Sequence, residues 1–186
     1  MKLTAFARAR HGLLVLTASL GLILGLSATP AQAASPSWYY LATVTIRPDH
    51  NPDHDKCLEV ADWSTANGAA VRQWTCTGGA NQQWQRWWWS GNPEGSYYYV
   101  NVHSGKCLEI GGWATNDGAT ANQWDCHYGL NQLFYSGLYG NRLATEAAYV
   151  PNKCLEIADW SRENGAPARL WTCHYGDNQG YSITAV

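Results

Sequence analysis

Charged residues are scarce in this sequence. Asp, Glu, Lys and Arg make up 14% of its 186 residues, and the formal net charge is −2. No stretch gathers lysine and arginine into a basic patch, and binding to a phosphate backbone depends on such clusters. The composition therefore argues against nucleic acid as a partner.

The short motifs of common catalytic sites are also missing. The sequence contains no Gly-x-Ser-x-Gly, no His-Glu-x-x-His and no glycine loop of the kind that cradles phosphates. Glycoside hydrolases need two carboxylates about 5 to 10 Å apart, but the prominent glutamates of this chain recur once in each of three repeats. Catalytic groups are seldom copied in this way, so we expect no enzymatic activity and no cofactor.

Helical periodicity is absent beyond the first 33 residues. The aromatic and β-branched stretch 38–46 predicts a strand, and further aromatic strands are expected at 85–89 and 97–102. Between them, 47–55 is rich in Asp, His, Asn and Pro and is typical of a loop. Short strands separated by turn residues predict an all-β fold that is closed or radially repeated.

The first residues have the pattern of a secretory signal peptide. Lys2, Arg8 and Arg10 precede the apolar run 12–26, and the small-x-small signature 31–33 follows. The apolar run is short for a membrane span, which needs roughly 20 residues, and no second such run follows it. We expect 1–33 to be removed and 34–186, which has 153 residues and a net charge of −5, to form one extracellular domain without membrane insertion.

A Lys-Cys-Leu-Glu unit occurs three times, beginning at Lys56, Lys106 and Lys153. Each copy has a second cysteine 19 positions after the first, and successive copies start 50 and then 47 residues apart. In an exported chain six cysteines indicate disulfides, for which fifteen pairings exist in principle. The repeat favours bridges within each copy: Cys57–Cys76, Cys107–Cys126 and Cys154–Cys173.

Each copy also carries an Asn-Gly or Asp-Gly turn between its two cysteines, at 67–68, 117–118 and 164–165. If the two cysteines of a repeat face each other across an antiparallel hairpin, the residue two after the first cysteine lies opposite the residue two before the second. This register pairs Glu59 with Trp74, Glu109 with Trp124 and Glu156 with Trp171. Alternation then turns Leu58 and Val60 toward the core. Each repeat would display a carboxylate beside an indole.

Together, the Cys-Leu-Glu-Val/Ile units, the Asn-Gly turns, the Trp two residues before each second cysteine and the closing Gln-x-aromatic motif resemble the ricin B-chain-type lectin domain, also known as carbohydrate-binding module family 13. The resemblance implies a β-trefoil of twelve strands in three lobes, here called lobe 1 (about 38–84), lobe 2 (85–134) and lobe 3 (135–181). Each lobe would carry one shallow sugar site for galactose-, xylose- or arabinose-type glycans or polysaccharide.

In that family an aromatic ring stacks on the sugar, and an acid together with an Asn-Gln pair binds its hydroxyls. Carried over by motif, the carbohydrate-binding residues are Glu59, Trp74, Asn81 and Gln82 in lobe 1, Glu109, Trp124, Asn131 and Gln132 in lobe 2, and Glu156, Trp171, Asn178 and Gln179 in lobe 3.

Two departures from the family pattern bear on the sites. The acid is glutamate where sugar-binding members usually have aspartate, and the position four before the second cysteine is Arg72, Asn122 or Arg169. Either arginine can pair with the neighbouring glutamate and occupy the site. The closing motif of the family is Gln-x-Trp, and its last residue is Trp84 in lobe 1, Phe134 in lobe 2 and Tyr181 in lobe 3. Lobe 1 therefore keeps the pattern best.

Other aromatic and polar residues have simpler interpretations. Trp63, Trp113 and Trp160, six residues after each first cysteine, are expected to pack on the core rather than to wall the site. The triplets 87–89 and 97–99 cannot be wholly buried and should form part of a contact surface.

The Asp/His loop at 49–55 has no specific ligand spacing, so we expect a solvated loop and no metal site. His127 and His174 have the pattern of turn residues. The alternative to a lectin is a secreted trefoil scaffold that binds or inhibits a protein partner.

Overall fold

The computed structural model describes residues 37–91, 95–136, 141–148 and 152–186. The expected signal peptide lies outside these ranges. Among the described residues no helix is long and apolar enough to cross a membrane.

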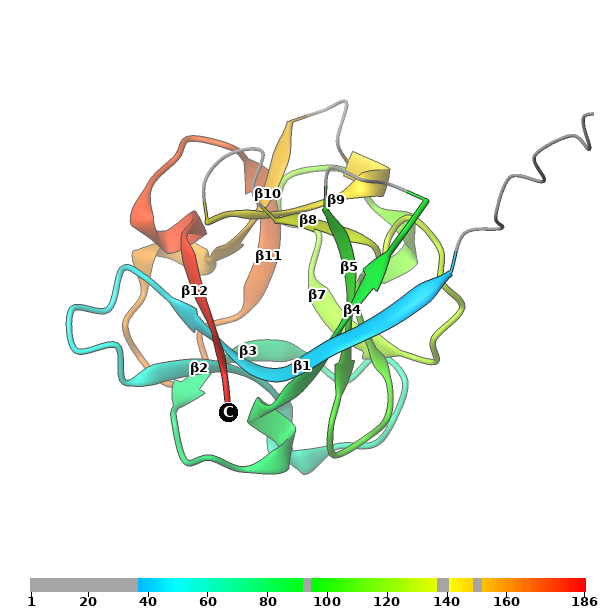
Figure 1. Ribbon diagram of the computed structural model, residues 1–186. Coiled ribbons are helices and arrows are strands. Elements are labelled where there is room, and N and C mark those ends of the chain that lie inside the picture. Colours follow the sequence, from blue (N-terminus) through cyan, green and yellow to red (C-terminus); the bar gives the residue numbers. More distant parts are fainter. Residues whose placement is uncertain (1–36, 92–94, 137–140, 149–151) are drawn as a thin grey trace, which may run out of the picture. The chain divides into compact units, whose positions relative to one another are not determined.

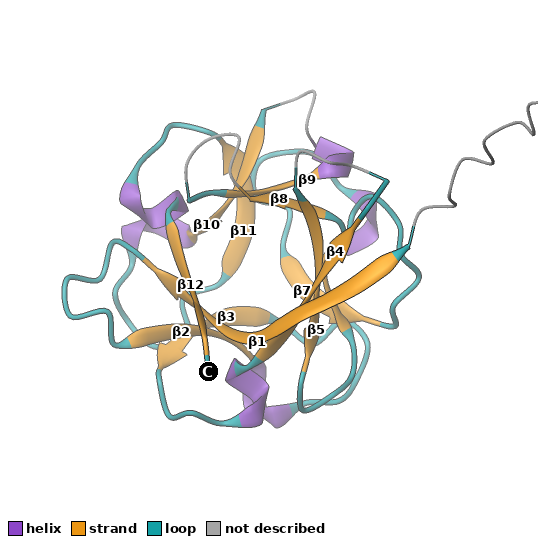
Figure 2. Ribbon diagram, viewed as in Figure 1, coloured by secondary structure: helices purple, strands orange, loops and turns teal. Residues whose placement is uncertain are grey.

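The described residues form strands joined by turns and single 3₁₀ turns, with no α-helix among them. The strands are β1 (Trp38–Pro48), β2 (Lys56–Val60), β3 (Val71–Thr75), β4 (Trp84–Trp89), β5 (Ser96–Asn101), β6 (Cys107–Ile110), β7 (Ala121–Trp124), β8 (Phe134–Ser136), β9 (Leu143–Thr145), β10 (Lys153–Ile157), β11 (Ala168–Thr172) and β12 (Tyr181–Ala185). The 3₁₀ turns are η1 (Ala61–Trp63), η2 (Ala80–Gln82), η3 (Gly111–Trp113), η4 (Glu146–Ala148), η5 (Ala158–Trp160) and η6 (Asp177–Gln179), and they lie around the periphery in Figure 2.

Six strands close a barrel. Antiparallel pairing runs from β12 to β1, β4, β5, β8 and β9. The ring closes between β9 and β12, where Arg142 bridges Gly180 and the Tyr181 amide donates to the Asn141 carbonyl at 2.9 Å. The first and last strands therefore lie side by side, as Figure 1 shows.

The other six strands form three hairpins, β2–β3, β6–β7 and β10–β11. Each hairpin's Gly turn donates its amide to a strand of another hairpin: Gly68 to the Gln123 carbonyl at 2.8 Å, Gly118 to Leu170 at 2.9 Å and Gly165 to Gln73 at 2.9 Å. These glycines have φ of 81°, 86° and 91°, a region that side chains rarely adopt. A barrel with three interlocked hairpins is the predicted β-trefoil.

The core contains the same positions from each repeat. Leu58, Leu108 and Leu155 are fully buried, as are the valine or isoleucine two residues later. The closing aromatics Trp84, Phe134 and Tyr181 are also buried, at the starts of β4, β8 and β12. The Trp84 indole donates to the Leu58 carbonyl at 3.1 Å. The predicted core face of the Lys-Cys-Leu-Glu unit is confirmed.

The three predicted disulfides are present, each with its Cα atoms 5.1 Å apart. The predicted hairpin register, however, is wrong. Cys57 lies opposite Trp74, and Glu59 lies opposite Arg72 rather than Trp74. Likewise Glu109 faces Asn122, not Trp124, and Glu156 faces Arg169, not Trp171.

The cause of the register error lies at the strand end. β3 stops at Thr75, and the Cys76 amide then donates to the Asp55 carbonyl at 2.7 Å. Cys76 is thus offset by two residues from Cys57, and a disulfide does not require directly opposite positions. A shift of two leaves every side chain on its original face, which is why the core was predicted correctly.

The loop at 49–55 is less solvated than expected. His50 and Asn51 are buried, and the His50 Nε2 lies 2.8 Å from the Ser161 carbonyl oxygen. The Asn51 amide donates to Gln73 Oε1 at 3.3 Å. The His50 contact ties the start of lobe 1 to lobe 3, whereas the Asn51 hydrogen bond lies within lobe 1. No group of three or more metal-ligating side chains occurs in the part of the chain that the structure describes.

Candidate functional site

A buried glutamate stands at the base of each lobe's pocket. Glu59, Glu109 and Glu156 are only 4%, 4% and 2% exposed. In lobe 1, Asn81 Nδ2 and Gln82 Nε2 donate to Glu59 Oε2 at 3.3 and 3.1 Å. Asn131 and Gln132 hold Glu109 in the same way, as do Asn178 and Gln179 with Glu156. The structure therefore brings together the predicted acid, asparagine and glutamine of each lobe.

The asparagine and glutamine have different positions relative to the pocket. Asn81, Asn131 and Asn178 line it, whereas the glutamines lie behind the glutamate and line none of the three pockets. Gln82 Nε2 also donates to the Thr75 carbonyl at 2.9 Å, and its Oε1 accepts from the Thr77 amide at 2.7 Å. Gln82, Gln132 and Gln179 thus hold the loop and the carboxylate in place.

The local chain explains how the amides reach the carboxylate. In lobe 1 the 3₁₀ turn η2 follows Gly79 and places Asn81 and Gln82 side by side. Asn81 Nδ2 donates to the Val60 carbonyl at 3.1 Å as well as to Glu59. Its Oδ1 is buried without a hydrogen-bond partner, as are the Oδ1 atoms of Asn131 and Asn178. Each lobe therefore has an unused acceptor beside its pocket.

Two tryptophans from each repeat line the pocket. Trp74, Trp124 and Trp171 do so as predicted. Trp63, Trp113 and Trp160 also line it, and they are 51%, 53% and 52% exposed, so the expectation that they pack on the core is wrong. Each adopts a left-handed backbone conformation, with φ of 53°, 58° and 57°. It ends a 3₁₀ turn that follows the buried strand, which directs the indole away from the barrel.

Arginine occupies the pockets of lobes 1 and 3. Arg72 Nε donates to Glu59 Oε1 at 3.0 Å, its Nη2 donates to Asp62 at 2.9 Å, and its Cζ lies 4.5 Å from the Trp74 ring centroid. This confirms that the arginine pairs with the neighbouring glutamate. The cation also covers the indole on which a sugar would stack.

Lobe 3 repeats this arrangement closely. Arg169 binds Glu156 at 3.0 Å and Asp159 at 2.9 Å, with its Cζ 4.4 Å from the Trp171 centroid. Desolvation by itself would lower the pKa of Arg169, but its hydrogen bonds to Glu156 and Asp159 and their negative charges outweigh desolvation and raise the pKa. The guanidinium therefore remains charged and tied to both carboxylates.

Lobe 2 lacks this cluster. Asn122 replaces the arginine and Gly112 replaces the aspartate, and the pocket is larger, at about 320 Å³ against about 220 Å³ in lobe 1 and 180 Å³ in lobe 3. Trp124 is 42% exposed, whereas Trp74 and Trp171 are half-buried. The Asn122 Oδ1 is a further buried acceptor without a partner. Lobe 1 keeps the family motif best in sequence, but the pocket of lobe 2 is the one with the more exposed indole.

Two histidines that were predicted to be turn residues belong to two of the sites. His127 Nε2 lies 3.3 Å from Glu109 Oε2, and His174 Nε2 lies 3.4 Å from Glu156 Oε2. Each also stacks on the second indole of its lobe, Trp113 or Trp160, at 5.9 Å. In lobe 1 the position is Thr77. The sequence signal for these residues is their position directly after the second cysteine of the repeat. The histidine side chain at this position lies against the glutamate of the same lobe.

Comparisons with known proteins agree with the fold and the repeat. A family model described as "Ricin-type beta-trefoil lectin domain-like" matches residues 38–124, and one described as "Ricin-type beta-trefoil lectin domain" matches 95–186. No curated protein matches the chain.

Several solved structures are similar. The designed three-fold symmetric protein ThreeFoil is 29% identical, with a TM-score of 0.68, over 77% of this chain and 99% of its own. An exo-β-1,3-galactanase from Clostridium thermocellum is 26% identical, with a TM-score of 0.68, over 78% of this chain and 30% of its own. The C-half of an earthworm R-type lectin, solved in complex with GalNAc, is 17% identical, with a TM-score of 0.59, over 78% of this chain and 100% of its own.

Proposed function

The chain belongs to the ricin-type β-trefoil lectin domain family, and on that premise we propose that it is a secreted carbohydrate-binding module whose principal sugar site is the lobe-2 pocket. The proposed ligand is a neutral pyranose of the galactose, xylose or arabinose type, carried on a polysaccharide or a glycan-dense surface. Lobes 1 and 3 are proposed to bind the same class of sugar more weakly.

The observation that carries the proposal is an open indole beside a fixed carboxylate. A pyranose has an apolar face that packs on an aromatic ring, and its hydroxyls need fixed acceptors and donors. Trp124 supplies the ring, since among the described residues no arginine contacts its face and the indole is 42% exposed. Glu109 supplies the acceptor, and the Asn131 and Gln132 amides hold its carboxylate in one orientation. The hydroxyls of the sugar would meet a preorganised site.

Lobes 1 and 3 also have a tryptophan beside a buried glutamate, but in each of them an arginine lies over the indole. A sugar entering lobe 1 would compete with Arg72 for the face of Trp74 and for Glu59 Oε1. A cation–π contact at a partly exposed site is worth about 0.5–1 kcal/mol, and hydrogen bonds to charged groups about 1.5–3 kcal/mol. Displacing the arginine would therefore cost more than a single stacking contact returns, which supports weaker binding in these lobes.

The sugar class rests on the family and on its structural neighbours. The similar domain from Clostridium thermocellum is part of an exo-β-1,3-galactanase, and the earthworm lectin was solved with GalNAc. Both names point to galactose-type sugars in those proteins. A module with three pockets on one polysaccharide would gain avidity through multivalent contact, so weak individual sites are sufficient for retention on a polymer.

Secretion is proposed from the leader and the cysteines. Residues 1–33 have the composition of a signal peptide. All six cysteines form disulfides, which form and persist in oxidising compartments. Both observations support an extracellular protein.

A polysaccharide pull-down tests the proposal. The folded, disulfide-bonded protein is passed over immobilised galactan, arabinoxylan and galactose-, xylose- or arabinose-bearing matrices, and bound protein is eluted with the free sugar. Retention with elution by free sugar is expected. No retention on any matrix would overturn the proposal, and capture of a protein from culture supernatant that free sugar does not release would favour the scaffold alternative.

A further inference from the structure

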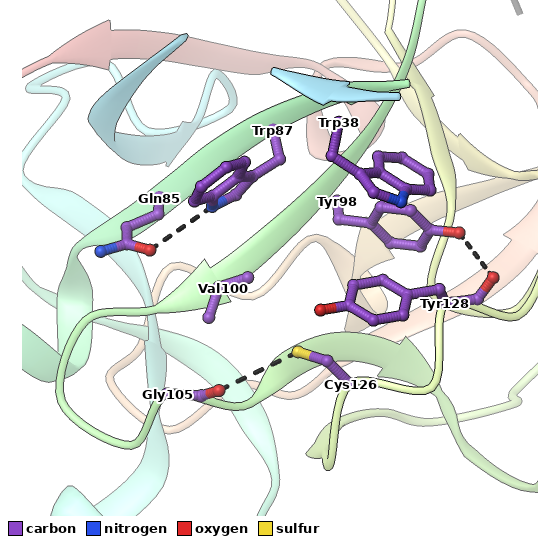
Figure 3. Close-up of a pocket in the computed structure, with 8 residues that line it drawn as sticks. All are labelled: Trp38, Gln85, Trp87, Tyr98, Val100, Gly105, Cys126 and Tyr128. Carbon is purple, nitrogen blue, oxygen red and sulfur yellow. Dashed lines mark hydrogen bonds between the residues drawn. The ribbon is translucent and has the colours of Figure 1, made fainter. Parts of the chain in front are cut away.

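A fourth pocket, of about 270 Å³, lies outside the three lobe pockets. Strands β1, β4 and β5 and the turns beside β6 and β7 form it, as Figure 3 shows. Its lining residues are mostly aromatic or apolar, and none of those that the structure describes is charged: Trp38, Gln85, Trp87, Tyr98, Val100, Gly105, Cys126 and Tyr128. We call it the aromatic cleft.

The rings of the aromatic cleft are held in place by one another. Trp38 stacks on Trp89 at 5.8 Å and meets the edge of Tyr98 at 4.3 Å. Trp38 also stacks on Tyr128 at 5.8 Å. The Tyr98 hydroxyl donates to the Tyr128 carbonyl at 2.6 Å, which fixes the turn after β7 against β5. The cleft is therefore preorganised, and a ligand would lose little affinity to ordering of side chains.

The Tyr98 hydroxyl keeps its proton. Burial raises its pKa, and the negative charge of Glu146 and the neighbouring Tyr128 raise it further. A neutral phenol donates the hydrogen bond to Tyr128 at any pH at which the protein is expected to work. The cleft as a whole thus presents no net charge to a ligand.

We propose that the aromatic cleft is an additional carbohydrate site, which binds one neutral pyranose ring independently of the three lobes. The size is suitable for one ring, because pockets for drug-sized ligands begin at about 300 Å³ and this one has about 270 Å³. The apolar face of the ring packs on Trp87, Trp38 or Tyr128. An uncharged cleft favours an uncharged sugar over a uronic acid or a phosphorylated one.

Polar groups at the edge of the aromatic cleft suit the hydroxyls of such a ring. Gln85 contributes a side-chain amide, whose Oε1 accepts from Trp87 Nε1 at 3.4 Å, and Gly105 contributes a backbone carbonyl, as Figure 3 shows. In Figure 3 the Tyr128 hydroxyl points toward Val100, into the cleft. A slot of aromatic faces with a few convergent polar groups is the composition that distinguishes a sugar site from a purely apolar docking groove.

The aromatic cleft and the lobe-2 pocket share one turn but no lining residue. His127 lines the lobe-2 pocket, whereas its neighbours Cys126 and Tyr128 line the cleft. The equivalent tyrosine of lobe 3 is Tyr175, which has the same left-handed backbone (φ of 62° against 60°) and similar exposure. Tyr175 lies under Arg142, with the Cζ 5.3 Å from its ring, and does not line the cleft. It is therefore a matched control.

The test follows the tryptophan indole N–H signals of the ¹⁵N-labelled protein by NMR during titration with a panel of methyl glycosides of galactose, glucose, mannose, xylose and arabinose. Trp38 and Trp87 report on the aromatic cleft, and Trp113 and Trp124 report on lobe 2. We expect at least one glycoside to shift the Trp38 and Trp87 signals, also in the Trp124→Ala variant. Tyr128→Asn should weaken that response at least tenfold, and Tyr175→Asn should leave it unchanged.

Asparagine is chosen because it tolerates the left-handed backbone, so both variants should fold. If glycosides shift only the Trp113 and Trp124 signals, the aromatic cleft proposal is overturned while the proposed function stands. If glycosides shift only the Trp38 and Trp87 signals, the aromatic cleft proposal stands and the proposed lobe-2 sugar site is overturned. Cleft signals that move on dilution without sugar would assign the surface to self-association, and cleft signals that no glycoside moves would also overturn the proposal.

Discussion

At the scale of single residues, two substitutions that act together distinguish the site of lobe 2 from those of lobes 1 and 3. Arginine with aspartate closes lobes 1 and 3, while Asn122 with Gly112 leaves lobe 2 open. The pairing of arginine with glutamate was predicted from the sequence, but the position of the guanidinium over the indole was not. The exposed positions of Trp63, Trp113 and Trp160 could not be predicted either, since they follow from a left-handed backbone at non-glycine residues.

Exchanging these residues between lobes tests their role. The double variant Arg169→Asn with Asp159→Gly gives lobe 3 the residue types that lobe 2 has at the equivalent positions, because His174 and Glu156 already match His127 and Glu109. We expect the Trp171 indole signal to shift at sugar concentrations that shift Trp124 in the parent protein. Gly112→Asp with Asn122→Arg is the reciprocal control and should close lobe 2. A folded lobe-3 variant with an unmoved Trp171 signal would contradict this assignment.

Removing the stacking ring should affect the lobes unequally. Stacking on an aromatic ring is worth about 0.5–1.5 kcal/mol beyond its buried area, and 1.4 kcal/mol is a factor of ten in affinity. We expect Trp124→Ala to weaken binding to immobilised polysaccharide about tenfold. Trp74→Ala, in which the lost ring was covered by Arg72, should have a much smaller effect. Equal losses, measured with both variants shown to be folded by circular dichroism, would argue that all lobes bind alike.

The arginine clusters should also contribute to stability. Arg72 donates to the buried Glu59, whose side chain is 6% exposed. Hydrogen bonds to charged groups contribute about 1.5–3 kcal/mol, so Arg72→Asn should lower the free energy of unfolding by about that amount in guanidinium denaturation. Glu109, which has no arginine partner, provides the comparison: Asn122→Ala should cost less. If Arg72→Asn left the free energy of unfolding unchanged, the hydrogen bonds from Asn81 and Gln82 alone would be sufficient for the Glu59 carboxylate.

At the scale of elements, the hairpins connect the lobes through their turns. Core faces, turn positions and disulfides were predictable, because each depends on a local pattern repeated three times. The register was not, since a shift of two residues preserves every face and moves only the partners. That shift places Glu59 and Glu156 directly opposite the arginines. The arginine–glutamate pairs were predicted from the sequence, but their cross-strand position was not.

The interlocking turns give a prediction at this scale. Gly118 has φ of 86°, and an added Cβ would meet no atom within 4 Å, so only backbone strain opposes a side chain there. Left-handed backbone costs other residues roughly 1–2 kcal/mol. Gly118→Ala should lower the free energy of unfolding by about this amount. Gly118→Asn should lower the free energy of unfolding less than Gly118→Ala does, because asparagine tolerates the left-handed conformation. Equal losses in the two variants would show that contacts of the new side chain, and not backbone strain, cause the destabilisation.

At the scale of the whole domain, three equivalent disulfides each link the ends of one hairpin. Closing loops of this length stabilises by about 3 kcal/mol each in the chain-entropy model, and small domains have a total stability of about 5–15 kcal/mol. Reduction of all three should therefore unfold the domain or lower its melting temperature steeply. Calorimetry with and without a phosphine reductant measures this, and an unchanged melting temperature with all six thiols titratable would contradict it.

The aromatic cleft also belongs to this scale, and only part of it could be predicted from the sequence. Exposed aromatics at 87–89 and 97–99 were expected to form a contact surface, and those triplets contribute Trp87 and Tyr98. The cleft itself depends on the pairing of β1 with β4 and of β4 with β5, together with Tyr128 from a distant turn. The strand pairings recur as β5 with β8 and β8 with β9, but Tyr175, the equivalent of Tyr128, lies under Arg142 instead, so the three-fold pattern could not reveal the cleft.

A structure of the protein in complex with the sugar that elutes it from polysaccharide tests the central claim most directly. At a sugar concentration that fills only the strongest lobe site, the account predicts a pyranose stacked on Trp124 with a hydroxyl bound to Glu109, and Arg72 and Arg169 still covering their indoles. A sugar bound first in lobe 1 or lobe 3, with Trp124 bare, would contradict it.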